Sequence, residues 1–381
     1  MANVSCVDLF CGAGGLTHGL VLEGIDVTAG IDVDPACRYP FEENNHGACF
    51  LKKDVRELCG EELGALFGEG GIRLLAGCAP CQPFSTYAQR YDIKRDHKWG
   101  LLYEFSRLAE ATQPDLVTME NVPSLAKNEV FLDFVEELKR LGYWTDYAIV
   151  DCSKYGVPQT RRRLVLLASR HGEIALIPPT ASKPCTVWEA IGHLPKIPAG
   201  GAWHEDPLHT ASGLSDINLQ RIRASKPGGS WKDWPEHLVA ACHRSKTGRT
   251  YPSVYGRMEW EKPSPTMTTQ CHGYGNGRFG HPSQDRAISL REAAILQSFP
   301  ETYKFAACHE DISFSALARL IGNAVPVELG RAVAKSVWAH LEYVGKVHAP
   351  TSRDGEYQSA QALVSSGLPS STAHPPEGHF G

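Results

Sequence analysis

Short apolar runs alternate with helical patterns from residue 1 to about residue 180 of this 381-residue chain. The apolar runs are predicted strands at residues 4–10, 27–31, 73–77, 115–119 and 164–168. Consecutive strands separated by helices pair in parallel, because a parallel return to the sheet needs a crossover connection. The sequence therefore predicts an α/β fold with a doubly wound, mostly parallel sheet.

The pattern changes near residue 178, where Pro- and Gly-rich sequence with few long helical patterns begins. We expect a second, smaller and irregular domain at residues 181–315. Leu317, Leu320, Leu329, Val333 and Val337 then follow a helical period, so residues 316–344 should return to the first domain, residues 1–180. Residues 345–381 are rich in Ser, Gly, Pro and His without apolar periodicity, and we expect a disordered tail.

The first strand runs directly into a glycine-rich turn, Cys11-Gly12-Ala13-Gly14-Gly15-Leu16, at the start of a helix. Bare backbone at a helix amino end favours an anionic ligand group, which is typical of a nucleotide-type cofactor. The spacing differs from G-x-G-x-x-G, so a plain dinucleotide fold is not favoured. Asp32, at the end of the next strand, either binds ribose hydroxyls or caps the following helix, and Asp54 can reach an adenine amino group.

A single thiol stands between two prolines in Pro80-Cys81-Gln82-Pro83-Phe84-Ser85, just after the predicted strand 73–77. Open α/β sheets bind their ligands at this end of the strands, although any one cysteine is more often a buried structural residue. Cys78 and Cys81 form a C-x-x-C, but no second pair or Cys/His cluster completes a metal site, and we predict none.

Two further segments carry polar groups toward the same edge. Residues 115–119 deliver Glu120 to the end of a strand, where a buried carboxyl group can share a proton with a ring nitrogen; an exposed edge-strand glutamate is the alternative. In an extended chain, Gln159, Arg161 and Arg163 lie on one face, while Arg162 points to solvent. A solvated basic turn is the alternative.

Six motifs in this order resemble the DNA cytosine-5 methyltransferase family, and the resemblance covers residues 4–343. They are Phe10 to Gly15, Pro80-Cys81-Gln82, Glu120-Asn121-Val122, Gln159 to Arg163, Arg291 to Pro300, and Gly322 to Pro326. Asp32 stands where the family often has Glu, and Lys98 where an Arg is common. Both substitutions keep the charge.

The resemblance implies an adenosylmethionine-dependent methyltransferase fold with a target recognition domain, and S-adenosyl-L-methionine as the cofactor. It implies methylation of C5 of a flipped cytosine in duplex DNA through a covalent bond between Cys81 and C6. The expected catalytic residues are Cys81, Glu120, Arg161 and Arg163. The expected cofactor-binding residues are Phe10, Gly12, Gly14, Gly15, Leu16, Asp32, Asp54, Val55 and Asn323. The expected DNA-binding residues are Gln82, Ser85, Lys98, Gln159, Arg244, Lys246, Arg249, Thr268 and Arg278.

The net charge of −5 is low for a DNA-binding protein, but the charge is unevenly distributed. Residues 221–280 contain ten Lys/Arg against four Asp/Glu, a net charge of +6. This region predicts salt-dependent attraction to phosphates, with a solvated loop region as the alternative. The chain has no long apolar run or leader pattern, so we expect a soluble, cytoplasmic monomer, and the resemblance makes a partner restriction endonuclease plausible.

Three other functions compete with this interpretation. A nicotinamide-dependent oxidoreductase shares the glycine turn and Asp32 but leaves Cys81 and Glu120 unexplained. A catalytically inactive DNA-binding regulator conflicts with the intact set of motifs. A methyltransferase acting on RNA is harder to exclude, although such relatives usually have a smaller recognition region and a Cys-Phe-Thr tripeptide that this chain lacks.

Overall fold

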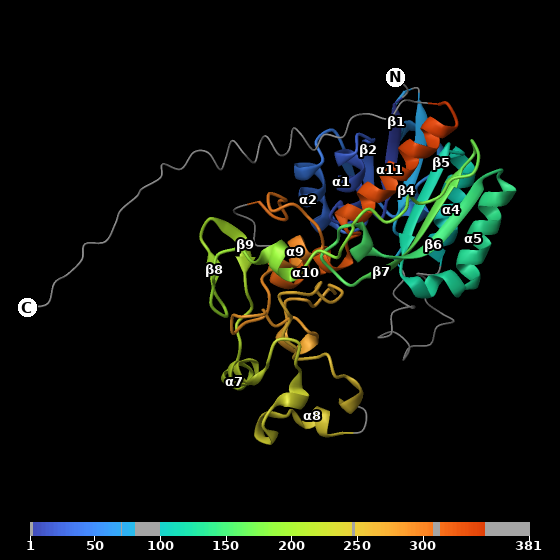
Figure 1. Cartoon of the computed structure of the whole chain (residues 1–381). Coiled ribbons are helices and arrows are strands. Elements are labelled where there is room, and N and C mark those ends of the chain that lie inside the picture. Colours follow the sequence, from blue (N-terminus) through green and yellow to red (C-terminus); the bar gives the residue numbers. More distant parts are fainter. Residues whose placement is uncertain (1–2, 70, 81–99, 246–247, 308–312, 347–381) are drawn as a thin grey trace, which may run out of the picture.

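The computed structural model describes residues 3–69, 71–80, 100–245, 248–307 and 313–346. Its centre is a seven-stranded sheet in the order β3-β2-β1-β4-β5-β7-β6 (Figure 1). The strands are β1 (Val4–Leu9), β2 (Asp26–Asp32), β3 (Cys49–Lys52), β4 (Ile72–Gly77), β5 (Leu116–Asn121), β6 (Trp144–Asp151) and β7 (Arg162–Ser169). In the described part of the chain, no helix is long and apolar enough to cross a membrane.

The first five strands are parallel, as the alternating pattern predicts. The chain builds outward from β1 through β2 to β3 and then returns to the other side of β1 with β4. The connections of β1 and β4 therefore leave the sheet in opposite directions, and ligands bind at such a switch point. The predicted doubly wound, mostly parallel α/β fold is confirmed.

Helices cover both faces of the sheet (Figure 1). Side chains alternate between the faces along β4, where Leu74 and Ala76 join one apolar core and Leu75 the other. The first core includes α1 (Gly15–Leu22), α2 (Arg38–Asn44), α10 (Phe314–Asn323) and α11 (Val327–Tyr343). The second includes α3 (Gly60–Leu66), α4 (Gly100–Thr112) and α5 (Glu129–Arg140).

The last two strands of the sheet are antiparallel to their neighbours. Strand β7 inserts between β5 and β6, and it runs opposite to β5 with Glu120 facing Val165 in the register. Because of this reversal, the residues that precede β7 lie at the edge of the sheet where β5 ends. Arg163 at the start of β7 and Glu120 at the end of β5 thus approach each other, although they come from opposite ends of their strands.

The region between β7 and α10 is irregular, as expected. It contains α6 (Val187–Ile191), β8 (Ala202–Trp203), β9 (Asp206–Thr210), α7 (Asp216–Ala224), α8 (Ala241–Arg244) and α9 (Leu290–Leu296). A small separate core holds Ile222, Trp231, Trp234, Leu238, Tyr274 and Ala287. Helix α9 instead joins the first core, together with Met258, Met267 and Phe279 of the same region, so these residues anchor the region to the sheet domain. The boundaries at residues 180 and 316 stay a proposal.

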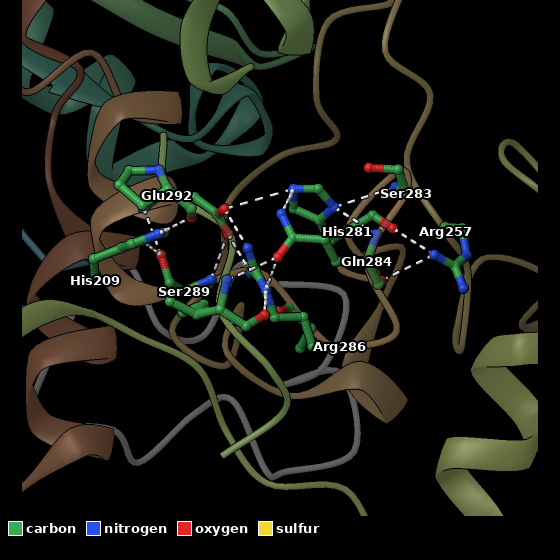
Figure 2. Close-up of polar contacts among 11 residues, drawn as sticks. His209, Arg257, His281, Ser283, Gln284, Arg286, Ser289 and Glu292 are labelled. Carbon is green, nitrogen blue, oxygen red and sulfur yellow. Dashed lines mark hydrogen bonds and ion pairs between the residues drawn. The ribbon is translucent and has the colours of Figure 1, made fainter. Parts of the chain in front are cut away.

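A buried polar network fixes the chain that enters α9 (Figure 2). The Arg286 guanidinium, which is fully buried, donates to both carboxylate oxygens of Glu292, each at 2.7 Å. Glu292 also accepts from the backbone N–H of Ser289 at 2.7 Å, which completes a capping box. The ion pair is bidentate and the carboxylate is fully hydrogen-bonded, so the burial of both charges is compensated.

Candidate active site

The candidate site lies at the carboxyl ends of β1, β4 and β5, beside the switch point. The backbone N–H of Cys78 donates to the carbonyl of Leu9 at 3.2 Å, which places the loop after β4 against the turn after β1. Gly77 pairs with Met119 in the register, so Cys78 and Glu120 are neighbours. Three segments that the sequence singles out separately therefore meet at one edge.

The turn after β1 has the backbone geometry of a ligand cradle. Phe10, Gly12 and Gly14 have φ of 59°, 54° and 83°, a region that glycine enters without strain. A Cβ on Gly12 would meet no atom within 4 Å, so the space beside this glycine is open. A Cβ on Gly15 would lie 2.2 Å from the carbonyl oxygen of Val325, so the loop after α10 packs against the turn. The turn thus has one open side and one supported side.

Asp32 holds the open turn in place. Its carboxylate accepts from the backbone N–H of Gly12 at 3.1 Å and from that of Asp34 at 2.9 Å, and burial raises its pKa. The ribose-binding role proposed for Asp32 is compatible with this position, because each oxygen keeps a lone pair. The alternative that Asp32 caps the following helix is wrong, because Asp34 caps the 3₁₀ turn at Pro35–Cys37. No side chain caps the amino end of α1 in the described residues. An anionic group fits this helix end, and a ribose fits beside Asp32.

Asp54 already binds other groups of the protein, which the sequence does not suggest. Its carboxylate caps a short 3₁₀ turn and forms an ion pair of 2.5 Å with Arg56. Val55, the next residue, is buried, and so is Leu16 in α1. Contact of Asp54 and Val55 with an adenine ring stays a prediction.

Glu120 is buried at the end of β5 and is held by two partners. Arg163 Nε lies 2.8 Å from Glu120 Oε1, and the Cys78 thiol donates to Glu120 Oε2 at 3.1 Å. The side chain of Glu120 is only 5% exposed and that of Arg163 13%, so little water screens the pair. The alternative of a solvated edge-strand glutamate is therefore wrong.

The loop that carries the thiol starts from a fixed point. Asn121, also buried, donates from its side-chain amide to the carbonyl of Ala79 at 3.0 Å. Glu120 and the start of this loop are thus positioned by adjacent residues of one strand. Cys81, Gln82, Ser85 and Lys98 lie outside the described residues, and their roles stay predictions.

Gln159 and Arg161 lie elsewhere than their sequence pattern predicts. Gln159 is fully buried, donates to the carbonyl of Leu296 at 3.0 Å and to Gln297 Oε1 at 2.6 Å, and accepts from the N–H of Met267 at 2.8 Å. The prediction that Gln159 contacts DNA is therefore wrong, because its amide is saturated inside the protein.

Arg161 is 2% exposed and donates to the carbonyl of Met267 at 2.9 Å and to that of Gly322 at 3.5 Å. Burial and the neighbouring Arg163 lower its pKa. Its predicted catalytic role is not supported, because its guanidinium binds carbonyls of two other segments. Of the three residues, only Arg163 reaches Glu120, and Arg162 is exposed as expected.

The last of the six motifs, Gly322 to Pro326, lies against the glycine turn, as the resemblance implies. Asn323 is exposed at the end of α10, two residues before Val325, whose backbone packs against the turn. A Cβ on Gly322 would lie 2.3 Å from the carbonyl oxygen of Thr268, whose side chain is exposed. Asn323 and Thr268 therefore lie close together. The sequence predicts that Asn323 binds the cofactor and that Thr268 binds DNA.

The candidate DNA-reading residues differ in how accessible they are. Arg244 and Arg249 are exposed, whereas Lys246 lies outside the described residues. Arg278 is half-buried and donates to the carbonyl of Gly229 at 2.8 Å, so part of its guanidinium is committed. It lines a cleft of about 380 Å³ together with Thr160, Lys262 and Thr266. Guanine contact by Arg278 stays a prediction.

The net charge of +6 overstates the positive surface of residues 221–280. Arg257 is buried and donates to the carbonyls of Ile222 and His281. The Arg221 guanidinium lies 5.5 Å from the ring centroids of both Trp234 and Tyr255, which pack against each other, and Arg221 donates to the carbonyl of Leu238. These charges stabilise the small core, so the attraction to phosphates must come from the remaining basic residues.

The family model of the C-5 cytosine-specific DNA methylases matches residues 4–339. The chain belongs to this family. Type II methylase M.HgiDII of Herpetosiphon aurantiacus is 53% identical over 341 residues, which cover 88% of this chain and 95% of that protein. Type II methyltransferase M1.HphI of Haemophilus parahaemolyticus is 31% identical over 349 residues, covering 88% and 87%.

A solved structure of a protein encoded within an E. coli prophage has the same fold. It superimposes with a TM-score of 0.69 at 22% identity and covers 89% of this chain and 100% of that one. The chain is thus an enzyme of the DNA cytosine-5 methyltransferase class. Family membership argues against an oxidoreductase and favours DNA over RNA as the substrate.

Sequence patterns missed several residues that support the site. Cys78 looked like half of a C-x-x-C and instead donates to Glu120. Asp8 is buried beneath the glycine turn, where the Thr17 hydroxyl donates to it at 2.6 Å. Tyr303 reaches Ala13 from 290 residues away. An acidic residue within an apolar strand pattern, such as Asp8, can be recognised in the sequence as a candidate. No sequence pattern indicates that Tyr303 contacts the glycine turn.

Proposed function

We propose that this chain transfers a methyl group from S-adenosyl-L-methionine to C5 of a cytosine flipped out of duplex DNA. The observation that carries the proposal is the buried Glu120, held by Arg163 and Cys78 beside the start of the Cys81 loop. A buried and paired carboxyl group at the ligand edge of a sheet is suited to acid catalysis on a ring nitrogen.

The residues of the glycine turn fit the cofactor. Gly12, Gly14, Gly15 and Leu16 would bind its carboxylate at the amino end of α1, and Asp32 its ribose hydroxyls. Phe10, Asp54, Val55 and Asn323 complete the proposed set. When bound, S-adenosylmethionine supplies an electrophilic methyl group on a sulfonium.

The reaction needs a nucleophile because C5 of cytosine is unreactive toward a sulfonium methyl group. The Cys81 thiolate adds to C6, and electron density moves to C5 and N3. Glu120 holds a proton between its carboxyl group and N3, and Arg163 holds Glu120 in this orientation. After C5 gains the methyl group, a base removes the C5 proton, the C5–C6 double bond re-forms and Cys81 leaves.

The covalent step can be tested by trapping. A duplex with 5-fluorocytosine at the target position should form a complex with the protein that survives a denaturing gel, because fluorine cannot leave C5 as a cation. The band should require S-adenosylmethionine and should be absent with Cys81→Ser. A methylating Cys81→Ser variant would overturn the role of Cys81.

Cys78→Ser is the matched control for the same assay. A serine hydroxyl can donate to Glu120 as the Cys78 thiol does, so this variant should keep most of its activity. Equal inactivity of both serine variants would reopen the interpretation of Cys78 and Cys81 as a functional C-x-x-C pair.

The names of the relatives suggest a biological setting. M.HgiDII and M1.HphI are Type II methylases, so we propose a role in modification beside a partner restriction endonuclease. The monomeric state and the cytoplasmic location stay predictions from sequence.

A further inference from the structure

Tyr303 lies directly behind the glycine turn, although it belongs to the segment that follows α9. Its side chain is buried, at 1% exposure, and its hydroxyl donates to the carbonyl oxygen of Ala13 at 2.5 Å. This hydrogen bond joins residues 290 positions apart in the chain. It links the carboxyl-terminal part of the protein to the backbone of the turn.

The ring of Tyr303 cannot easily move. It packs against Phe299, Phe305 and His18, with centroid distances of 4.6, 5.1 and 5.0 Å. The backbone carbonyl of Tyr303 accepts from Arg291 at 2.9 Å. Aromatic packing on three sides and an anchored backbone fix the position of the hydroxyl.

The hydroxyl contacts the peptide that sets the start of α1. Gly14 has φ of 83°, and a Cβ on it would lie 3.0 Å from the Tyr303 hydroxyl and 2.9 Å from Asn45 Nδ2. The Gly14 carbonyl accepts from the N–H of His18 at 2.8 Å, the first bond of the helix. The orientation of the Ala13–Gly14 peptide therefore determines where the first N–H groups of α1 point, and these have no partners within the helix.

We propose that Tyr303 is a positioning residue for S-adenosylmethionine, which acts by holding the Ala13–Gly14 peptide in its binding geometry. The inference rests on the proposed function for the cofactor. Loss of the hydroxyl leaves the Ala13 carbonyl without this partner and lets the turn sample other orientations. We expect cofactor affinity to fall about 5- to 10-fold, the effect of one hydrogen bond.

The test compares two tyrosine hydroxyls in the full-length protein. Tyr303→Phe removes the bond to Ala13, and Tyr143→Phe removes a bond of the same kind, from a buried tyrosine to the carbonyl of Pro114 at the opposite edge of the sheet. The probe is S-adenosylhomocysteine, with its Kd measured by calorimetry. We expect a raised Kd for Tyr303→Phe only, and a similar loss of thermal stability in both variants.

Steady-state kinetics give a second readout. Tyr303→Phe should raise KM for S-adenosylmethionine while kcat at saturating cofactor changes little, because the hydroxyl binds the backbone of the glycine turn and would act through cofactor binding. Phe299→Leu loosens the ring and keeps the hydroxyl, so it should shift Kd in the same direction. Should Tyr303→Phe not fold, Phe299→Leu decides the question.

The outcomes separate this inference from the proposed function. If the unaltered protein does not bind S-adenosylhomocysteine, the proposed cofactor is wrong. If the unaltered protein binds and both Tyr303→Phe and Phe299→Leu keep Kd within twofold, the turn does not depend on Tyr303 and the inference is overturned.

Discussion

At the scale of single residues, burial determines what each polar group can do. The carboxyl group of Glu120 can be buried at the site because Arg163 and Cys78 are its partners there. Gln159 and Arg161 also carry polar groups that could bind substrate. These groups instead form hydrogen bonds with carbonyls and amides of other segments of the protein. A motif therefore identifies residues that matter, while their partners decide whether they act on substrate or on the protein.

Asp8 allows a test of burial through pH. Burial raises its pKa from 3.8 to about 7, so the folded state favours the protonated carboxyl group. Its stabilising contribution is complete below about pH 4 and is lost as the pH rises to about 7. Asp8→Asn cannot ionise, so its stability relative to the unaltered protein should increase by about 3 kcal/mol between pH 5 and pH 8.

Urea unfolding at both pH values measures this difference. Asp146→Asn replaces an exposed carboxylate on β6 and serves as the control, for which we expect parallel curves. Parallel curves for Asp8→Asn as well would show that the buried carboxyl group ionises without cost.

At the scale of elements, the cofactor turn depends on close helix packing. Helices α1 and α11 approach through glycines, and a Cβ on Gly19 would lie 2.4 Å from the carbonyl oxygen of Val327 and 2.7 Å from the N–H nitrogen of Arg331. Both contacts are with backbone, which cannot rotate away. The helix that begins at the glycine turn is thus held in place by the last helix of the described chain.

Gly19→Ala should therefore destabilise the protein by about 3 kcal/mol, measured by urea unfolding, because overpacking forces the two helices apart. Gly64→Ala is the matched control, since Gly64 lies within α3 and its Cβ would meet no atom within 4 Å. That variant should gain about 0.5 to 1 kcal/mol through lower chain entropy and better helix propensity. Equal effects at both positions would contradict the close approach of α1 and α11.

At the scale of the whole molecule, the basic region is separate in sequence from the edge of the sheet that holds the candidate site. The two are joined through the first core, which contains α9 and, from the basic region, Met258, Met267 and Phe279. Several basic residues of 221–280 serve the small core, and others, among them Arg244 and Arg249, remain exposed. Binding of DNA phosphates should thus depend on this exposed subset and not on the full net charge.

Neutralising Arg244, Lys246 and Arg249 together with glutamine should weaken DNA binding and flatten its dependence on salt. The slope of log K against log salt should fall by up to about 0.9 for each phosphate that the variant no longer binds, measured by titration at several salt concentrations. A control that replaces Lys139, Arg140 and Arg170, exposed at the opposite edge of the sheet, should leave the slope unchanged. An unaltered slope in the first variant would place the phosphate-binding residues elsewhere.

Local sequence patterns are sufficient to predict five of the seven strands, the glycine turn and the position of Glu120. They do not predict β3, β6 or the antiparallel direction of β7. Apolar runs make strands, glycines permit φ of 54° and 83° at Gly12 and Gly14, and the residue near the end of a strand lies at its ligand edge. The strand pattern also predicts the alternating directions of Arg162 and its neighbours, because the period of two is a property of the backbone.

Which of these polar groups face the site depends instead on tertiary packing. Arg161 binds Met267 and Gly322, which are 106 and 161 residues away, and Tyr303 binds Ala13 across 290 residues. Partners at such separations depend on how packed elements meet, and no local pattern encodes them. The sequence therefore identifies the chemistry available to this protein, and long-range contacts select the residues free to perform it.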